Sequence, residues 1–212
     1  MLEWFYLGRE FMYEENSDVK QRLIEIGRKE FLEHGYLKAS MRNISSAANV
    51  TTGAIYFFFH NKEDFFRAIL DETATEWKKH LQDYSESEIS GIKTSAENDR
   101  ELISFLFTHK EEVRILFEKS AGTVYETYRE ELCEILEKAF LEFYKRFGGK
   151  KDDAGIVKII VRMRLQGYSE LLHGDYTMEQ AMRYAELLAF YGDSGFAGMM
   201  KQYNGLLEGS VI

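Results

Sequence analysis

Proline is absent from this chain of 212 residues. Because proline is the strongest breaker of helices, its absence permits long uninterrupted ones. A single cysteine, Cys133, excludes an intramolecular disulfide and fits a reducing compartment. No apolar run approaches the roughly 18 residues that cross a bilayer, and the N-terminus lacks the basic-then-apolar pattern of a signal peptide. We therefore expect a cytoplasmic protein without a membrane partner.

The chain also lacks the motifs of familiar enzymes. Its five histidines are scattered without paired metal-ligand spacing, and no phosphate loop, nucleophile elbow or cysteine–histidine signature occurs. We expect no catalytic residue, no metal and no cofactor. Two alternatives stay open at this point: an enzyme that works in a hydrophobic cavity, and a helical protein-interaction module.

Charge is distributed unevenly along the sequence. The net charge of −9 argues against a protein that coats nucleic acid through bulk charge. Residues 18–81 carry ten Lys/Arg and nine Asp/Glu, whereas residues 82–212 carry sixteen and twenty-three. The segment 18–81 is therefore the one most permissive for DNA binding.

Hydrophobic periodicity predicts an all-α fold, since no stretch alternates with period two for long enough to form a strand. The expected helices cover about 18–34, 40–48, 51–59, 61–80, 98–108, 110–120, 123–147, 152–173 and 178–207. The polar, serine-rich residues 85–97 are expected to form a loose connection or a frayed helix end. Residues 1–17 are an N-terminal extension, either packed on the protein or dispensable if translation begins at Met12.

The most informative segment is SMRNISSAANVTTGAIYFFFHNK, residues 40–62. Ser40 is a good N-cap for a short helix, and Asn49 tolerates the left-handed conformation of a tight turn. Thr51 can open a second short helix, and Asn61 a longer one. Two short helices joined by a tight turn are the unit that places a recognition helix in the major groove of DNA.

The second short helix has a polar face suited to DNA. Thr52 and Tyr56 are four residues apart, beside Thr51 at the helix start. Hydroxyls and threonine methyls can contact base edges, and a phenol can reach phosphate. Gly53 has no side chain, so the backbone can approach DNA closely. Tyr56 could alternatively be a half-buried core residue, and Thr51 only a cap.

Two cations flank this face. Arg42 projects from the first short helix and could reach guanine or phosphate, or could simply be solvated. Lys62 stands at the N-terminus of the long helix, where an ammonium beside free backbone N–H groups can bind phosphate. It could equally be an ordinary surface lysine.

The stretch from about Val19 to Leu70 resembles the tetracycline-repressor (TetR) family of bacterial transcription regulators. The resemblance is carried by FLEHGYLKAS, MRNISSAANV, TTGAIYFFF and HNKEDFFRAIL in that order. It implies an all-helical homodimer with a helix-turn-helix DNA-binding domain at 18–64 and a ligand-binding and dimerisation domain at 65–212. The implied function is that of a ligand-responsive regulator, a repressor released from palindromic operator DNA by a small-molecule inducer. The DNA contacts implied by position are Ser40, Arg42, Thr51, Thr52, Gly53, Tyr56 and Lys62.

The chain departs from the family pattern at three positions. Members often have lysine or arginine at the place of Thr52, and histidine or tyrosine at those of Phe57 and Phe58. A phenyl ring cannot donate a hydrogen bond to phosphate. The departures leave the predicted fold intact and make the individual contacts less certain.

The C-terminal part is rich in aromatic residues, most of which read as core. The resemblance places a largely apolar ligand cavity among these helices, for an apolar or aromatic inducer. The residues expected to form its wall are Trp77, Phe117, Tyr125 and Tyr128. Apolar stripes in 152–173 and 178–207 are expected to form a four-helix dimer interface, with ordinary intrachain packing as the alternative.

Overall fold

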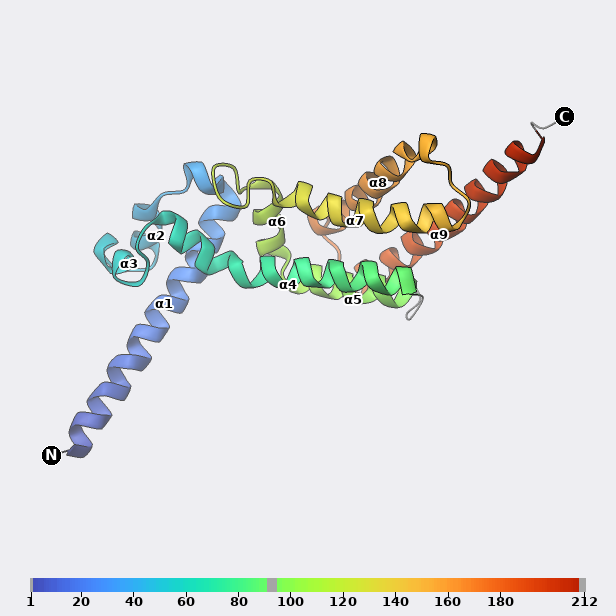
Figure 1. Cartoon of the computed structure of the whole chain (residues 1–212). Coiled ribbons are helices and arrows are strands. Elements are labelled where there is room, and N and C mark those ends of the chain that lie inside the picture. Colours follow the sequence, from blue (N-terminus) through green and yellow to red (C-terminus); the bar gives the residue numbers. More distant parts are fainter. Residues whose placement is uncertain (1, 91–94, 210–212) are drawn as a thin grey trace. The chain divides into compact units, whose positions relative to one another are not determined.

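A computed structural model describes residues 2–90 and 95–209 of the chain (Figure 1). All regular structure in these ranges is helical. The elements are α1 (Leu2–Lys38), α2 (Met41–Ala47), α3 (Thr52–Phe58), α4 (Lys62–Ser90), α5 (Ser95–Thr108), α6 (Lys110–Glu118), α7 (Tyr128–Arg146), the 3-10 helix η1 (Lys151–Asp153), α8 (Gly155–His173) and α9 (Met178–Gly209). No helix among the described residues combines the length and apolar character needed to cross a membrane.

The chain forms two compact units. Unit 1 comprises the chain up to Ala74 together with Glu111–Glu126, and unit 2 comprises Thr75–Lys110 and the chain from Thr127 onward. Helix α4 therefore contributes its first part to unit 1 and its second part to unit 2. The boundary predicted after residue 64 lies near the start of α4, and the segment around α6 belongs to the same unit as the helix-turn-helix.

Unit 1 is built on an aromatic core between α1 and the start of α4. Phe31, Phe65 and Phe66 are fully buried, and the Phe31 and Phe66 rings meet edge to face with centroids 4.8 Å apart. Gly27 of α1 lies against the Phe65 ring, so only a residue without a side chain fits there without displacing the ring. Ile44 of α2 and Ile55 of α3 are also fully buried and fix the two short helices to this core.

Unit 2 is a helical assembly in which α5 packs chiefly against α9, and α7 against α8. Trp77 of α4 stacks on Phe105 of α5 with centroids 5.4 Å apart and an interplanar angle of 19°. The other fully or nearly fully buried side chains of unit 2 include Leu81, Ile103, Leu106, Leu132, Tyr144, Val161 and Ala185.

Most helices lie where hydrophobic periodicity predicts them, with three corrections. First, α1 begins at Leu2, so the predicted start at Asp18 is wrong, although the predicted end near Gly35 coincides with a left-handed break there (φ 72°). Second, residues 85–90 and 95–97 are helical rather than a loose connection, while 91–94 lie outside the described residues. Third, residues 121–127 form turns, so α7 starts later than predicted. Local polarity misled the prediction at 85–97 because Ser85 and Ser87 are buried against neighbouring helices.

Candidate DNA-binding and ligand-binding sites

The connection from α1 through α3 is held by local capping. Ser40 is extended (φ −113°, ψ 116°), and its hydroxyl accepts from the Asn43 N–H at 3.3 Å. Its own N–H donates to Glu30 Oε1 at 2.8 Å, which ties the start of α2 to α1. The turn after α2 places Asn49 in the left-handed region with φ 54°. These features confirm the predicted cap at Ser40 and the predicted turn at Asn49.

Helix α3 begins as predicted and exposes one broad face. Thr51 Oγ1 accepts from the Ala54 N–H at 3.2 Å, so its hydroxyl caps the helix. Ile55 is fully buried and faces the core, which leaves Tyr56 48% and Phe57 75% exposed. A Cβ at Gly53 would meet only Thr51 Oγ1, at 3.7 Å, so the backbone is open to close approach.

Besides Ser40 and Thr51, two more of the predicted DNA contacts make side-chain hydrogen bonds inside the protein. The Thr52 hydroxyl shares a hydrogen bond with Ser45 Oγ at 3.0 Å, so it points toward α2. Lys62 Nζ donates to the Ala39 carbonyl at 2.7 Å and lies 4.8 Å from the centroid of the Tyr36 ring. Burial lowers the pKa of Lys62, although the nearby Glu30 opposes the shift. Arg42, in contrast, is exposed on α2.

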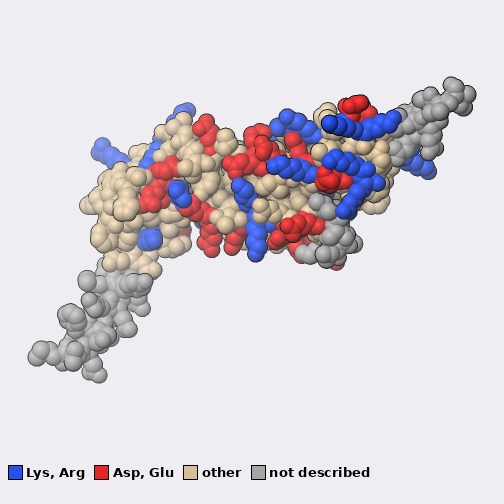
Figure 2. All heavy atoms as spheres, in the orientation of Figure 1, with Lys and Arg blue, Asp and Glu red and all other residues tan. Residues whose placement is uncertain are grey.

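The outer face of α3 includes Phe57 beside the predicted Tyr56. Successive residues on an α-helix are about 100° apart, so the buried Ile55 and Phe59 place Phe57 almost opposite the core. No lysine or arginine occurs between Thr51 and Asn61, and the surface over α2 and α3 is mostly uncharged on the face shown in Figure 2.

The four residues predicted to line a ligand cavity are divided between the units. Trp77 and Tyr128 belong to unit 2 and are 2% and 4% exposed. Phe117, half-buried in α6, and Tyr125, in the turns after it, belong to unit 1. None of the four borders the cavity described below.

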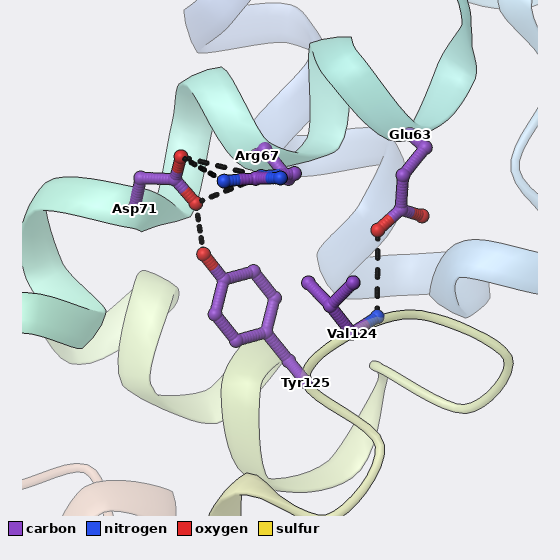
Figure 3. Close-up of polar contacts among 5 residues, drawn as sticks. All are labelled: Glu63, Arg67, Asp71, Val124 and Tyr125. Atoms are coloured by element: carbon purple, nitrogen blue, oxygen red, sulfur yellow. Dashed lines mark hydrogen bonds and ion pairs between the residues drawn. The ribbon is translucent and has the colours of Figure 1, made fainter.

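Tyr125 instead takes part in a polar cluster at the first part of α4 (Figure 3). Its hydroxyl donates to Asp71 Oδ1, and Asp71 also accepts from Arg67 Nε and Nη2 at 3.3–3.4 Å. Glu63 Oε1 accepts from the Val124 N–H at 3.4 Å. Desolvation, together with the bond to Asp71, raises the pKa of Tyr125, so the phenol stays protonated and remains a donor. The cluster fastens residues 124–125 to the helix that follows the helix-turn-helix.

Unit 2 contains a cavity of about 690 Å³. Its walls come from α7, α8 and α9, and Tyr84 of α4 also borders it. Most of the lining side chains are aromatic or aliphatic, and Arg164 and Asp193 are the charged ones. A cavity of this size and polarity suits a small organic ligand.

Arg164 of α8 belongs to a buried polar cluster that sequence reasoning missed. Its Nη2 donates to both carboxylate oxygens of Asp99, at 3.0 and 2.9 Å, and the Tyr168 hydroxyl donates to Asp99 Oδ1 at 2.7 Å. Desolvation raises the pKa of Asp99 even though Arg164 opposes the shift. The two charges are 65 residues apart in sequence, so no local pattern could have paired them.

Metal-binding potential is low in the described part of the chain, where no group of three or more His, Cys, Asp or Glu side chains lies close enough to hold an ion.

Comparison with known proteins relates these sites to a family. Residues 23–69 match the model of bacterial regulatory proteins of the tetR family. The HTH-type transcriptional regulator TtgR of Pseudomonas putida is 36% identical over 75 residues, 35% of this chain and 35% of TtgR. The uncharacterized HTH-type transcriptional regulator YhgD of Bacillus subtilis is 27% identical over 129 residues, 60% of this chain and 66% of YhgD. The chain thus matches less than two thirds of the length of either relative.

The likeness in fold extends over most of the chain. The solved structure of a TetR-like transcriptional regulator from Rhodococcus sp. RHA1 superposes with a TM-score of 0.57 at 15% identity, covering 84% of this chain and 96% of that one. At this identity the superposition establishes a shared fold. The matched residues 23–69 include the capped α2–turn–α3 unit, so this segment is similar to the DNA-binding part of bacterial regulatory proteins of the tetR family.

Proposed function

We propose that this protein is a transcriptional regulator that binds operator DNA through α2 and α3. The observation that carries the proposal is the outer face of α3, where Gly53, Tyr56 and Phe57 stand free of the core on a helix capped by Thr51. Such a helix fits the major groove, and exposed hydroxyls and rings can contact base edges and phosphates. Arg42 and Ser40, at the start of α2, are placed to reach the DNA backbone.

The proposal is tested by selecting bound sequences from random double-stranded DNA with the intact protein. Tyr56→Ala is expected to weaken binding to the selected DNA about tenfold, because a base or phosphate contact contributes on the order of 1–3 kcal/mol. Val124→Ala is the matched control, since that side chain is 61% exposed in unit 1 and the residue bonds Glu63 through its backbone. Equal loss in both variants, or no enriched sequence, would refute the proposal.

The regulator is proposed to act as a homodimer on a palindromic site. Helices α8 and α9 carry large apolar side chains that unit 2 leaves exposed, among them Ile159, Leu187, Phe190 and Tyr191 at 56–73%. An exposed apolar surface of this kind suits a twofold interface. Sedimentation of Ile159→Glu is expected to give monomer, while Lys158→Glu, exposed on the same helix, is expected to leave the dimer intact.

Regulation by a small molecule is proposed for the cavity of unit 2. Its apolar lining suits an apolar or aromatic inducer. An inducer releases DNA only if it binds one conformer of the dimer more tightly than the other. Helix α4 is continuous from the DNA-binding unit into the unit that holds the cavity, so it is the element that can transmit the difference. We expect the protein to repress transcription when it is bound to its operator.

A further inference from the structure

The cavity of unit 2 is apolar along most of its wall, has an exposed carboxylate, Asp193, and is charged at one buried place. Aromatic rings from α7 and α9 and methionine side chains from α8 and α9 form the apolar part, including Phe140, Phe143, Phe147, Phe196, Met163 and Met199. The charged place is formed by Arg164, whose side chain is only 20% exposed. A ligand that fills this space meets rings over most of its surface and one guanidinium.

Arg164 is held so that part of its hydrogen-bonding capacity remains unused. Nη2 contacts Asp99, and Nε points to the Tyr168 hydroxyl at 3.3 Å. The guanidinium carbon lies 5.9 Å from the Tyr84 ring centroid and 5.6 Å from that of Phe140, and both rings border the cavity. The Nη1 amino group has no hydrogen bond among the described residues, and it carries two N–H donors.

We propose that this cavity binds an amphipathic carboxylate, with its apolar body among the rings and its carboxylate on Arg164. The inference rests on the proposed function and names the chemical class of its inducer. A guanidinium is a fixed fork of donors that matches a carboxylate, and it stays charged when buried. Because Arg164 is largely buried, this pairing contributes more than it would in water.

The two carboxylates near Arg164 do not favour a cationic ligand over an anionic one. Asp99 is fully buried and contacts the guanidinium through Nη2 only, which leaves the N–H donors of Nη1 for an anionic ligand. Asp193 borders the cavity but is exposed, so water screens its charge. A cationic head that entered the buried part of the cavity would be repelled by Arg164.

Displacement of a neutral fluorescent probe tests the inference on the intact protein. N-phenyl-1-naphthylamine is bound first and then displaced by dodecanoic acid, by dodecan-1-ol or by dodecyltrimethylammonium, all below their micellar concentrations. A hydrogen bond to a charged group is worth about 1.5–3 kcal/mol, so the acid is expected to displace the probe at a concentration roughly 10- to 100-fold lower than the alcohol.

The test variant removes both charges of the pair, because Arg164→Gln alone would leave Asp99 buried without its partner. In Asp99→Asn/Arg164→Gln the preference for acid over alcohol is expected to fall to about one, with the affinity for the alcohol kept. The matched control is Glu130→Gln/Arg162→Gln, which removes an exposed ion pair of 2.9 Å between α7 and α8. Its preference for the acid is expected to match that of the wild type.

The outcomes separate this inference from the proposed function. Equal displacement by acid and alcohol, strongest displacement by the cation, or a preference that survives in the test variant would overturn the inference. DNA binding is measured separately by gel shift with the selected sequence. A protein that binds DNA but shows no preference for the acid retains the proposed function and loses the inference. A preference for the acid that depends on the pair supports the inference even if no DNA is bound.

Discussion

Lys62→Met distinguishes a lysine that stabilises the fold from one that binds phosphate. The ammonium donates to the carbonyl of Ala39, in the link between α1 and α2, and stacks on Tyr36. Methionine keeps most of the apolar stem and removes both interactions. The Ala39 carbonyl then loses its partner in a half-buried place.

The magnitude follows from the two contacts. A hydrogen bond from a charged donor contributes about 1.5–3 kcal/mol and a partly exposed cation–π contact about 0.5–1 kcal/mol. Partial exposure of Lys62 lets water replace some of this, so the expected loss of unfolding free energy is about 1–2 kcal/mol. Lys20→Met is the control, because its exposed ammonium lies over Phe59 at 5.8 Å and should contribute a few tenths of a kcal/mol.

Urea unfolding measures how much Lys62 stabilises the fold. The salt dependence of DNA binding measures whether Lys62 neutralises a phosphate. A lysine that neutralises one phosphate contributes about 0.9 to the slope of log affinity against log salt concentration. We expect Lys62→Met to lower the urea midpoint and to change that slope by clearly less than this amount. An unchanged midpoint together with a slope reduced by about 0.9 would refute the structural role of Lys62.

Three further predictions concern packing, the polar cluster and pH. Gly27→Ala places a Cβ against the Phe65 ring. Although alanine has the better helix propensity, we expect the free energy of unfolding, measured in urea, to fall by about 1–2 kcal/mol. Equal or higher stability would contradict the close packing of Gly27 on Phe65. Tyr125→Phe removes the hydroxyl that donates to Asp71. We expect the free energy of unfolding to fall by about 1 kcal/mol and proteolysis near residue 125 to become faster. Unchanged cleavage would show that this hydrogen bond does not hold the segment. Burial raises the pKa of Asp99 in the native state, so the native state binds its proton more tightly than the unfolded state does. The contribution of Asp99 to the free energy of unfolding is therefore greatest below the pKa of the unfolded state and falls as pH rises through the pKa of the native state. The stability of wild type relative to Asp99→Asn should accordingly decrease as pH rises above about 4 in urea titrations, and an increase would mean that pairing outweighs burial.

Much of the DNA-binding unit follows from local sequence rules. The caps at Ser40 and Thr51 and the left-handed Asn49 are properties of single residues beside their own helices, and each occurs where the pattern predicts it. Thr52 and Lys62 behave differently from expectation because their partners, Ser45 and Ala39, are set by tertiary packing. Helical spacing alone does not reveal which hydroxyl or ammonium already has an acceptor inside the protein.

Less of unit 2 could be predicted from the sequence. The family resemblance implied an apolar cavity but did not reveal which rings surround it: Trp77 stacks on Phe105, and Tyr125 binds Asp71. The buried pair of Arg164 and Asp99 joins α8 to α5, and such pairing depends on how distant helices pack. A single sequence carries no signal for it.

Hydroxyl-radical footprinting of the intact protein on its selected DNA tests the central claim most directly. Two recognition helices related by a twofold axis should protect two equivalent half-sites of an inverted repeat, about 34–36 Å apart centre to centre or a multiple of this. Tyr56→Ala should weaken protection at both half-sites to the same extent. A single protected patch, or symmetric protection that Tyr56→Ala leaves unchanged, would contradict the assignment of α3 as the DNA-reading helix.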